Sequence, residues 1–150
     1  MSMIIALGMM ALSAPATDAA HHHATTIEHR GVPMDVRYRA SVDLATKPMG
    51  VSPPTRAGIG RCAWVATIAV ERQMAPAGTT GSGLTRIVSS DYKIKGSRAG
   101  SCMTSKSAIA QEVAARDAEI RSHVLAVAER DKSTLLAELE SGFAATRELR

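Results

Sequence analysis

The chain has 150 residues, 45% of them hydrophobic, and a formal net charge of +4 at pH 7. This length suits one domain of ordinary size, which buries enough surface to fold without metals or many cross-links. Aromatic residues make up 3% of the chain. This scarcity argues against a carbohydrate platform or a base-stacking surface, which both need flat ring faces, and we expect no nucleic-acid partner.

Residues 1–20 have the features of a secretory signal peptide. An uncharged apolar run over residues 3–12 is too short to span a bilayer but matches the apolar region of such a signal, and small residues follow it. No Lys or Arg precedes the run. We expect a periplasmic or secreted bacterial protein with no transmembrane segment in its mature chain; the alternative is an apolar N-terminal helix retained in the fold or on a membrane.

The next part of the chain carries strand patterns. Residues 21–33 are expected to form a flexible polar segment and a short strand over 25–29. Residues 34–44 alternate strictly between apolar and polar, which predicts a strand with one buried and one solvated face. Residues 61–72 are apolar on both faces and predict a central strand, at least partly covered on both sides. Residues 84–95 alternate less cleanly and suit an edge strand, and stretches rich in Pro and Gly (47–60 and 73–83) predict loops.

After residue 100 the apolar residues recur at helical spacing, at Ile109, Val113, Ile120, Val124 and Val127. Residues 105–130 contain no Gly or Pro and predict a long helix, with its N-cap among Thr104, Ser105 and Ser107. A second helical piece over 134–141 either follows a bend or continues the first. Gly142 is expected to end it, leaving 142–150 as a frayed tail.

Strands that come first and helices that come last predict an α+β domain over residues 34–141. In this fold class, an antiparallel meander of about four strands is packed by a long C-terminal helix. Cys62 opens the central strand and Cys102 precedes the helix, and the chain has no other cysteine. In an oxidising compartment such a pair is expected to form a disulfide. A reactive thiol and a metal ligand are the alternatives.

The clearest candidate for metal binding is the tract His21, His22 and His23, because imidazoles bind Cu²⁺, Ni²⁺ and Zn²⁺. No acidic residue or cysteine accompanies the tract at ligand spacing, apart from Asp18 in the leader, so we favour a polar spacer. His29 and His123 are single. No nucleophile, histidine and carboxylate stand in a recognisable catalytic pattern. We therefore expect neither an enzyme nor a cofactor.

Basic residues dominate the first part of the mature chain, where residues 20–100 contain eleven Lys and Arg but five Asp and Glu. If the strands that carry them are neighbours, a positive patch forms on the open face of the sheet; its members are Arg37, Arg39, Lys93, Lys95 and Arg98. The patch suits an anionic envelope component or an acidic protein surface. We thus expect a non-catalytic binding or envelope-associated domain. A helix-mediated homo-oligomeric assembly module and a periplasmic enzyme of unrecognised type are the alternatives.

Overall fold

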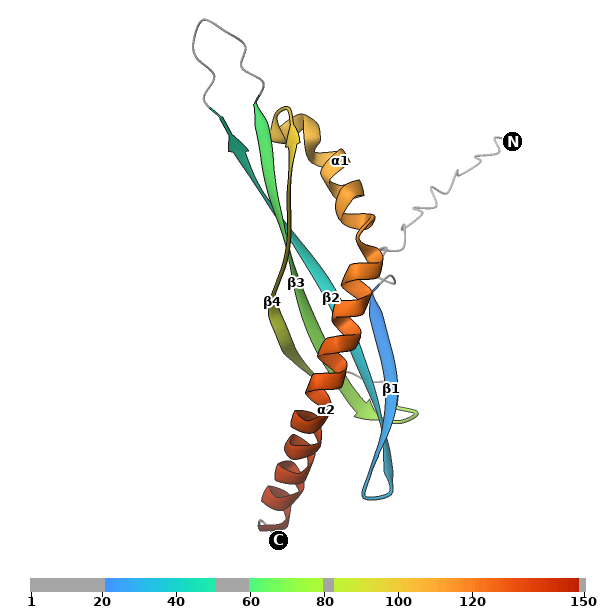
Figure 1. Ribbon diagram of the computed structural model, residues 1–150. Coiled ribbons are helices and arrows are strands. Elements are labelled where there is room, and N and C mark those ends of the chain that lie inside the picture. Colours follow the sequence, from blue (N-terminus) through green and yellow to red (C-terminus); the bar gives the residue numbers. More distant parts are fainter. Residues whose placement is uncertain (1–20, 51–59, 80–82, 149–150) are drawn as a thin grey trace, which may run out of the picture.

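The computed structural model describes residues 21–50, 60–79 and 83–148. Within these ranges four strands form one antiparallel sheet in the order β1-β2-β3-β4, and two helices follow. The elements are β1 (His22–His29), β2 (Val32–Met49), β3 (Arg61–Pro76), β4 (Leu84–Ala99), α1 (Cys102–Ala114) and α2 (Asp117–Glu148). Figure 1 shows a long twisted sheet with both helices running along it. The predicted α+β class, with a meander sheet and C-terminal helix, is confirmed.

The hydrophobic core lies between one face of the sheet and the helices. Even-numbered side chains of β2 and β3 point into it, from Val36 to Ala40 and from Cys62 to Val70. The helices contribute the apolar stripe expected from the sequence, together with Leu135. Alternation in the strands and the helical spacing therefore place their apolar residues in the same layer.

All strands are longer than predicted. β1 begins at His22, three residues before the expected start, and β2 continues to Met49 into the segment predicted as a loop. Pairing explains the extension, because residues 45–49 of β2 pair with residues 61–65 of β3 in an unbroken ladder. Residues 51–59 of the predicted loop and the whole predicted signal peptide lie outside the described residues.

A two-residue turn joins β1 to β2. Arg30 and Gly31 have φ angles of 51° and 78°, as a type I′ turn requires at both of its central positions. Glycine tolerates this conformation, whereas arginine adopts it at some cost. Arg30 is held there by an ion pair with Glu140 of α2, at 2.6 Å.

β3 is central and β4 lies at an edge, as the sequence predicts. The described helices pack on one face only, and on the opposite face the side chains of Ala63, Val65, Thr67 and Ala69 are half-buried. The expected cover over both faces of β3 is therefore not seen in the described part of the chain. Small side chains between longer neighbours on β2 and β4 lose part of their exposure without a covering layer. We call this side the open face.

The helical region is divided differently from the prediction. The helix is interrupted at residues 115–116 and not at 131–133. At this point six residues, among them Arg116 and Asp117, separate Val113 from Ile120 in the apolar stripe. The N-cap is Ser101, whose hydroxyl accepts a hydrogen bond from the Thr104 amide at 3.2 Å. The predicted caps lie inside α1. α2 runs through Gly142 to Glu148, because one glycine costs only about 1 kcal/mol relative to alanine in a helix.

A close contact between Trp64 and Gly96 joins β3 and β4 near the disulfide end of the sheet. These residues pair across β3 and β4, and a Cβ atom at Gly96 would lie 2.4 Å from the indole ring. The glycine thus leaves room for the largest side chain of the core. Within the residues that the structure describes, no helix is both long and apolar enough to cross a membrane.

Candidate functional sites

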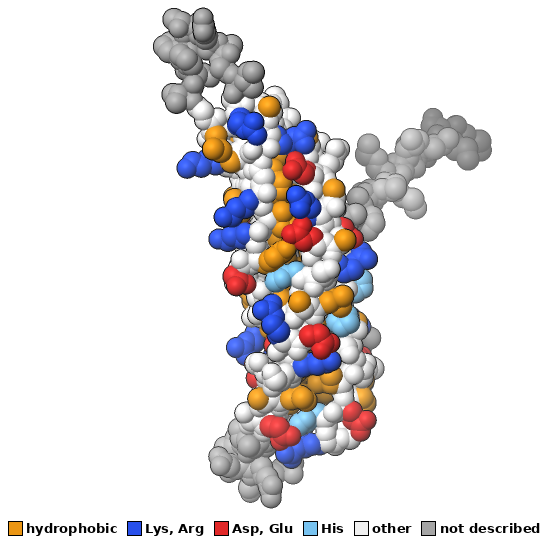
Figure 2. Space-filling model, in the orientation of Figure 1, with side chains coloured by type: hydrophobic (Ala, Val, Ile, Leu, Met, Phe, Trp, Pro, Cys, Tyr) orange, Lys and Arg blue, Asp and Glu red, His pale blue; other side chains and the backbone are white. Residues whose placement is uncertain are grey.

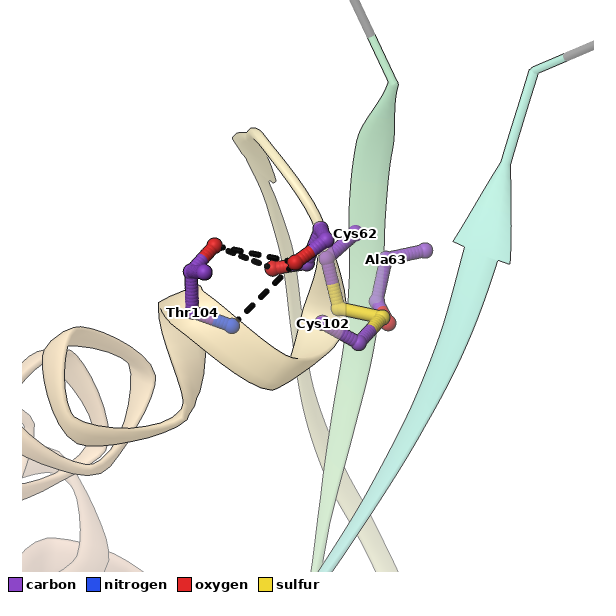
Figure 3. The surroundings of a disulfide bond; sticks show 5 residues. Cys62, Ala63, Cys102 and Thr104 are labelled. Carbon is purple, nitrogen blue, oxygen red and sulfur yellow. Dashed lines mark hydrogen bonds between the residues drawn. A yellow bond between two sulfur atoms is a disulfide. The ribbon is translucent and has the colours of Figure 1, made fainter. Parts of the chain in front are cut away.

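The two cysteines form the predicted disulfide. The Sγ atoms of Cys62 and Cys102 are 2.01 Å apart and the Cα atoms 4.9 Å apart. Figure 3 shows the bridge joining the start of β3 to the first turn of α1, beside the hydrogen bonds of the N-cap. Cys62 is fully buried. The bond therefore ties helix to sheet at the end of the core where the helical region begins.

The predicted basic patch is only partly assembled. Arg37 and Arg39 of β2 pair with odd-numbered residues of β3, as do Lys93 and Lys95 of β4, so all four lie on the open face. However, β2 and β4 are not neighbours, because β3 separates them. The β3 partners of Arg39 and Lys93 are four residues apart, which corresponds to roughly 13 Å along the strand. The arginines and the lysines are thus two separate groups.

Arg98 does not belong to this patch. It pairs with Cys62, whose side chain points to the helices, and its Nη1 atom lies 3.4 Å from Glu112 of α1. Lys47 takes its place: the extension of β2 pairs Lys47 with Ala63 on the open face. Lys47, Lys93 and Lys95 therefore form one lysine group around the half-buried small residues of β3. The sequence pattern missed Lys47 because the nearby prolines indicated a loop.

The histidine tract is not a free spacer, because His22 and His23 open β1 and His21 directly precedes it. His21 Nδ1 lies 3.1 Å from Asp117 of α2, and His23 stacks on Tyr38 with ring centroids 6.3 Å apart. Further along β1, the buried His29 has its Nε2 atom 3.6 Å from Glu140. In the described part of the chain, no group of three or more His, Cys, Asp or Glu side chains is arranged to hold a metal ion.

His123 lies in a small polar cluster between β4 and α2. Its ring stacks on Tyr92 at 4.1 Å, and its Nε2 atom is 3.5 Å from the hydroxyl of Ser89. That hydroxyl donates to Asp91 at 3.1 Å. Two register shifts in the pairing of β3 with β4 at this level bring Ser89 toward the helix side. A polar cavity of about 310 Å³ adjoins the cluster.

The His123 cluster lacks the order of a catalytic triad. Asp91 contacts the serine, whereas a triad needs the carboxylate behind the imidazole. Burial lowers the pKa of His123, Arg130 lowers it further, and Asp91 opposes them. The histidine is thus held neutral at pH 7. We interpret this cluster as a packing contact that closes the edge strand against α2.

A buried charged cluster that was not predicted from the sequence lies between the sheet and α2. Its members are Arg72, Asp131, Glu138, Tyr38 and Arg86. Arg72 is 3% exposed, and its guanidinium donates to Asp131 at 2.7 Å and also to Glu138. The Tyr38 hydroxyl donates to Asp131 at 3.0 Å, and Arg86 pairs with the other oxygen of Glu138. The cluster therefore connects β2, β3 and β4 to α2.

These hydrogen bonds shift the pKa values of Arg72 and Tyr38. Burial alone would lower the pKa of Arg72, but the hydrogen bonds to Asp131 and Glu138 outweigh it and raise that pKa. Burial and the bond to Asp131 also raise the pKa of Tyr38. Arg72 is therefore a permanent buried cation balanced by two carboxylates, and Tyr38 stays a neutral donor.

Beside the cluster lies a mainly apolar cavity of about 500 Å³, between the ends of β3 and β4 and α2. Met74, Leu84 and Leu139 supply apolar walls, while Arg72, Arg86 and Glu138 supply the charged end. Figure 2 shows apolar side chains gathered toward the lower end of the helix-bearing face, among acidic and basic ones. Comparisons with protein-family models, with curated proteins and with solved structures found no match.

Proposed function

We propose that this chain is an exported, non-catalytic binding domain whose open sheet face docks onto a phosphate-bearing envelope surface. The observation that carries the proposal is the lysine group, in which Lys47, Lys93 and Lys95 surround small uncharged residues of β3. Each lysine is a flexible point charge that does not demand one fixed acceptor geometry. A group of such side chains can therefore bind several phosphates that are spread over a surface.

The composition of the open face favours this partner over an acidic protein. Protein interfaces are enriched in Tyr, Trp and Phe, which serve as buried anchors. The described strands place Tyr38, Trp64 and Tyr92 on the helix-bearing face. The open face therefore offers charge without aromatic anchors, and attraction to it depends on ionic strength.

Export is supported by the apolar run at residues 3–12 and by the disulfide, since disulfides persist in oxidising compartments. N-terminal sequencing of protein from the periplasm or the medium tests this part. A start within a few residues of Ala20 is expected. An intact Met1 on cytosolic protein with two alkylatable thiols would overturn it.

Surface binding is tested by sedimentation with vesicles that contain phosphatidylglycerol or only phosphatidylcholine. We expect binding to the anionic vesicles that weakens as salt rises. Lysines near an anionic membrane contribute about 1 kcal/mol each, so Lys93→Gln with Lys95→Gln should reduce binding on the order of thirtyfold. The matched control is Lys106→Gln with Arg130→Gln, which removes the same charge from exposed helix positions. Equal losses in both double variants would reduce the effect to net charge and contradict the assigned face.

The arrangement of α2 speaks against helix pairing as the main function. The apolar stripe considered for a partner helix is buried in the core of the chain itself, and among the side chains of α2 that the structure describes, the exposed large hydrophobic ones are Leu125 and Leu136, at 43% and 46%. Light scattering that shows a monomer at micromolar concentration is the expected result.

A further inference from the structure

The geometry points to a second binding site, separate from the open face: the cavity beside the buried charged cluster binds a single-chain aliphatic carboxylate. The cavity volume of about 500 Å³ lies within the roughly 300–1,000 Å³ range of small-molecule sites. Its walls are largely apolar and its charged groups gather at one end. This division matches an amphiphile with an aliphatic tail and one polar head.

The accessible hydrogen-bond donors at the polar end select an anionic head. Both oxygens of Glu138 are engaged, one by Arg72 and one by Arg86, and Arg72 is also paired with Asp131. Arg86 is 62% exposed, and among the described residues its ion pair uses Nη1 alone. The remaining N–H groups of Arg86 are thus the accessible donors, and a guanidinium binds a carboxylate through two parallel hydrogen bonds. A single accessible guanidinium matches a head with a single negative charge.

Two features of the walls provide room for the tail. Leu84 pairs with Met74 at the start of β4, and it is 76% exposed, so its side chain is accessible to a ligand in the cavity. Gly142 of α2 also lines the cavity, and a Cβ atom built there meets no atom within 4 Å. Glycine at this position makes α2 less stable than alanine would. A small residue here leaves space in the cavity that a bulky side chain would fill.

The cavity is tested by titration calorimetry of the full chain with decanoate below its micelle concentration. Decyltrimethylammonium, which has the same tail and a cationic head, is the comparison ligand. We expect one molecule of decanoate to bind each chain, and the cation to bind at least about tenfold more weakly because the accessible donors belong to Arg86, whereas both oxygens of Glu138 are already paired. In NMR spectra, decanoate should shift the amides of residues 84–86 and 138–142. Equal affinity for both heads, or no binding at all, would overturn the assignment.

Gly142→Phe should abolish decanoate binding by filling the cavity, whereas Gly142→Ala should retain it. Both variants gain helix propensity, and far-UV circular dichroism confirms their fold. Leu84→Glu is the second blocking variant; it changes an exposed side chain, and its carboxylate repels the head group. Arg86→Gln should weaken decanoate about tenfold but should not weaken the cationic ligand, because it frees one oxygen of Glu138. Wild-type binding by both blocking variants would refute the site.

The cavity proposal and the surface-binding proposal can be refuted independently of each other. Lys93→Gln with Lys95→Gln should leave decanoate binding unchanged, because these lysines lie on the open face. Gly142→Phe should likewise leave vesicle binding unchanged. Loss of decanoate binding in the lysine variant would show that the carboxylate binds on the open face and overturn the cavity assignment.

Discussion

The two ends of the helix–sheet contact are fastened by different chemistry. At the end where α1 begins, a disulfide joins Cys62 to Cys102 beside a core of apolar side chains. Toward the other end, the buried guanidinium of Arg72 is shared between two carboxylates of α2. The first fastening restricts the unfolded chain and is lost on reduction. The second restricts how α2 sits on three strands and is insensitive to thiol chemistry.

The disulfide and the charged cluster constrain the helices to different degrees. A disulfide fixes one point and permits rotation around it, whereas the charged cluster requires α2 to present Asp131 and Glu138 to Tyr38, Arg72 and Arg86 in one register. Replacing a complete buried ion cluster with apolar residues is often neutral, but breaking it from one side is costly. The distinctive contribution of the cluster is therefore alignment of the helix, and its energetic signature appears when one partner is removed.

The largest effect is expected from Arg72→Met. This change leaves Asp131 and Glu138 without their buried cation, and such a loss typically costs about 3–5 kcal/mol. Urea unfolding at pH 7 with the disulfide intact measures the change. Adding Asp131→Asn and Glu138→Gln to Arg72→Met should recover part of the loss, since the uncompensated charges are then removed. A loss below about 1 kcal/mol in the single variant would mean that the cluster is solvated.

Removing the disulfide should come next. Cys62→Ser with Cys102→Ser opens a ring of 40 residues, and loop-closure entropy assigns such a ring about 4 kcal/mol before native strain is subtracted. The measured loss should therefore be somewhat smaller than that figure, and it should match the effect of reducing the wild-type protein. Urea unfolding with and without reductant makes the comparison. If reductant destabilises the double variant as strongly as the wild type, the disulfide is not the cause.

The apolar end is probed by Gly96→Ala. The added methyl group would overlap the ring of Trp64, and overpacking of this kind costs about 1–3 kcal/mol. Gly60→Ala is the matched control, because a Cβ atom there meets nothing within 4 Å. Thermal unfolding of both variants, followed by the fluorescence of the single tryptophan, should show a lower midpoint for Gly96→Ala alone. A wild-type midpoint would mean that the indole moves aside without cost.

Much of the apolar end was predictable from the sequence. Alternation over residues 34–44 and 61–72 indicated which side chains of β2 and β3 are buried, and the helical spacing from Ile109 to Val127 indicated the facing stripe. The pairing of Cys62 with Cys102 followed from their number and the expected compartment. These signals are local periodicities, and the core is the layer in which they coincide.

The charged end was not predicted, although its signal was present. Arg72 continues the even-numbered buried positions of β3, and Asp131 and Glu138 continue the apolar stripe of α2. A charge in phase with a buried stripe on each of two elements indicates a mutual partner. The cavity depends on how strand ends and helix diverge in space, which no local pattern encodes.

The smallest effect concerns His123, which lies between the two ends. Burial lowers its pKa in the folded state, so below the ordinary value of about 6.5 the unfolded chain binds this proton more readily. The contribution of His123 to stability is therefore complete above pH 6.5 and is lost as the pH falls toward the lowered pKa. His123→Phe keeps a ring against Tyr92 and cannot titrate. The free energy of unfolding should fall less between pH 7.5 and 5.5 in this variant than in the wild type. An equal fall in both proteins would assign the acid sensitivity to groups other than His123.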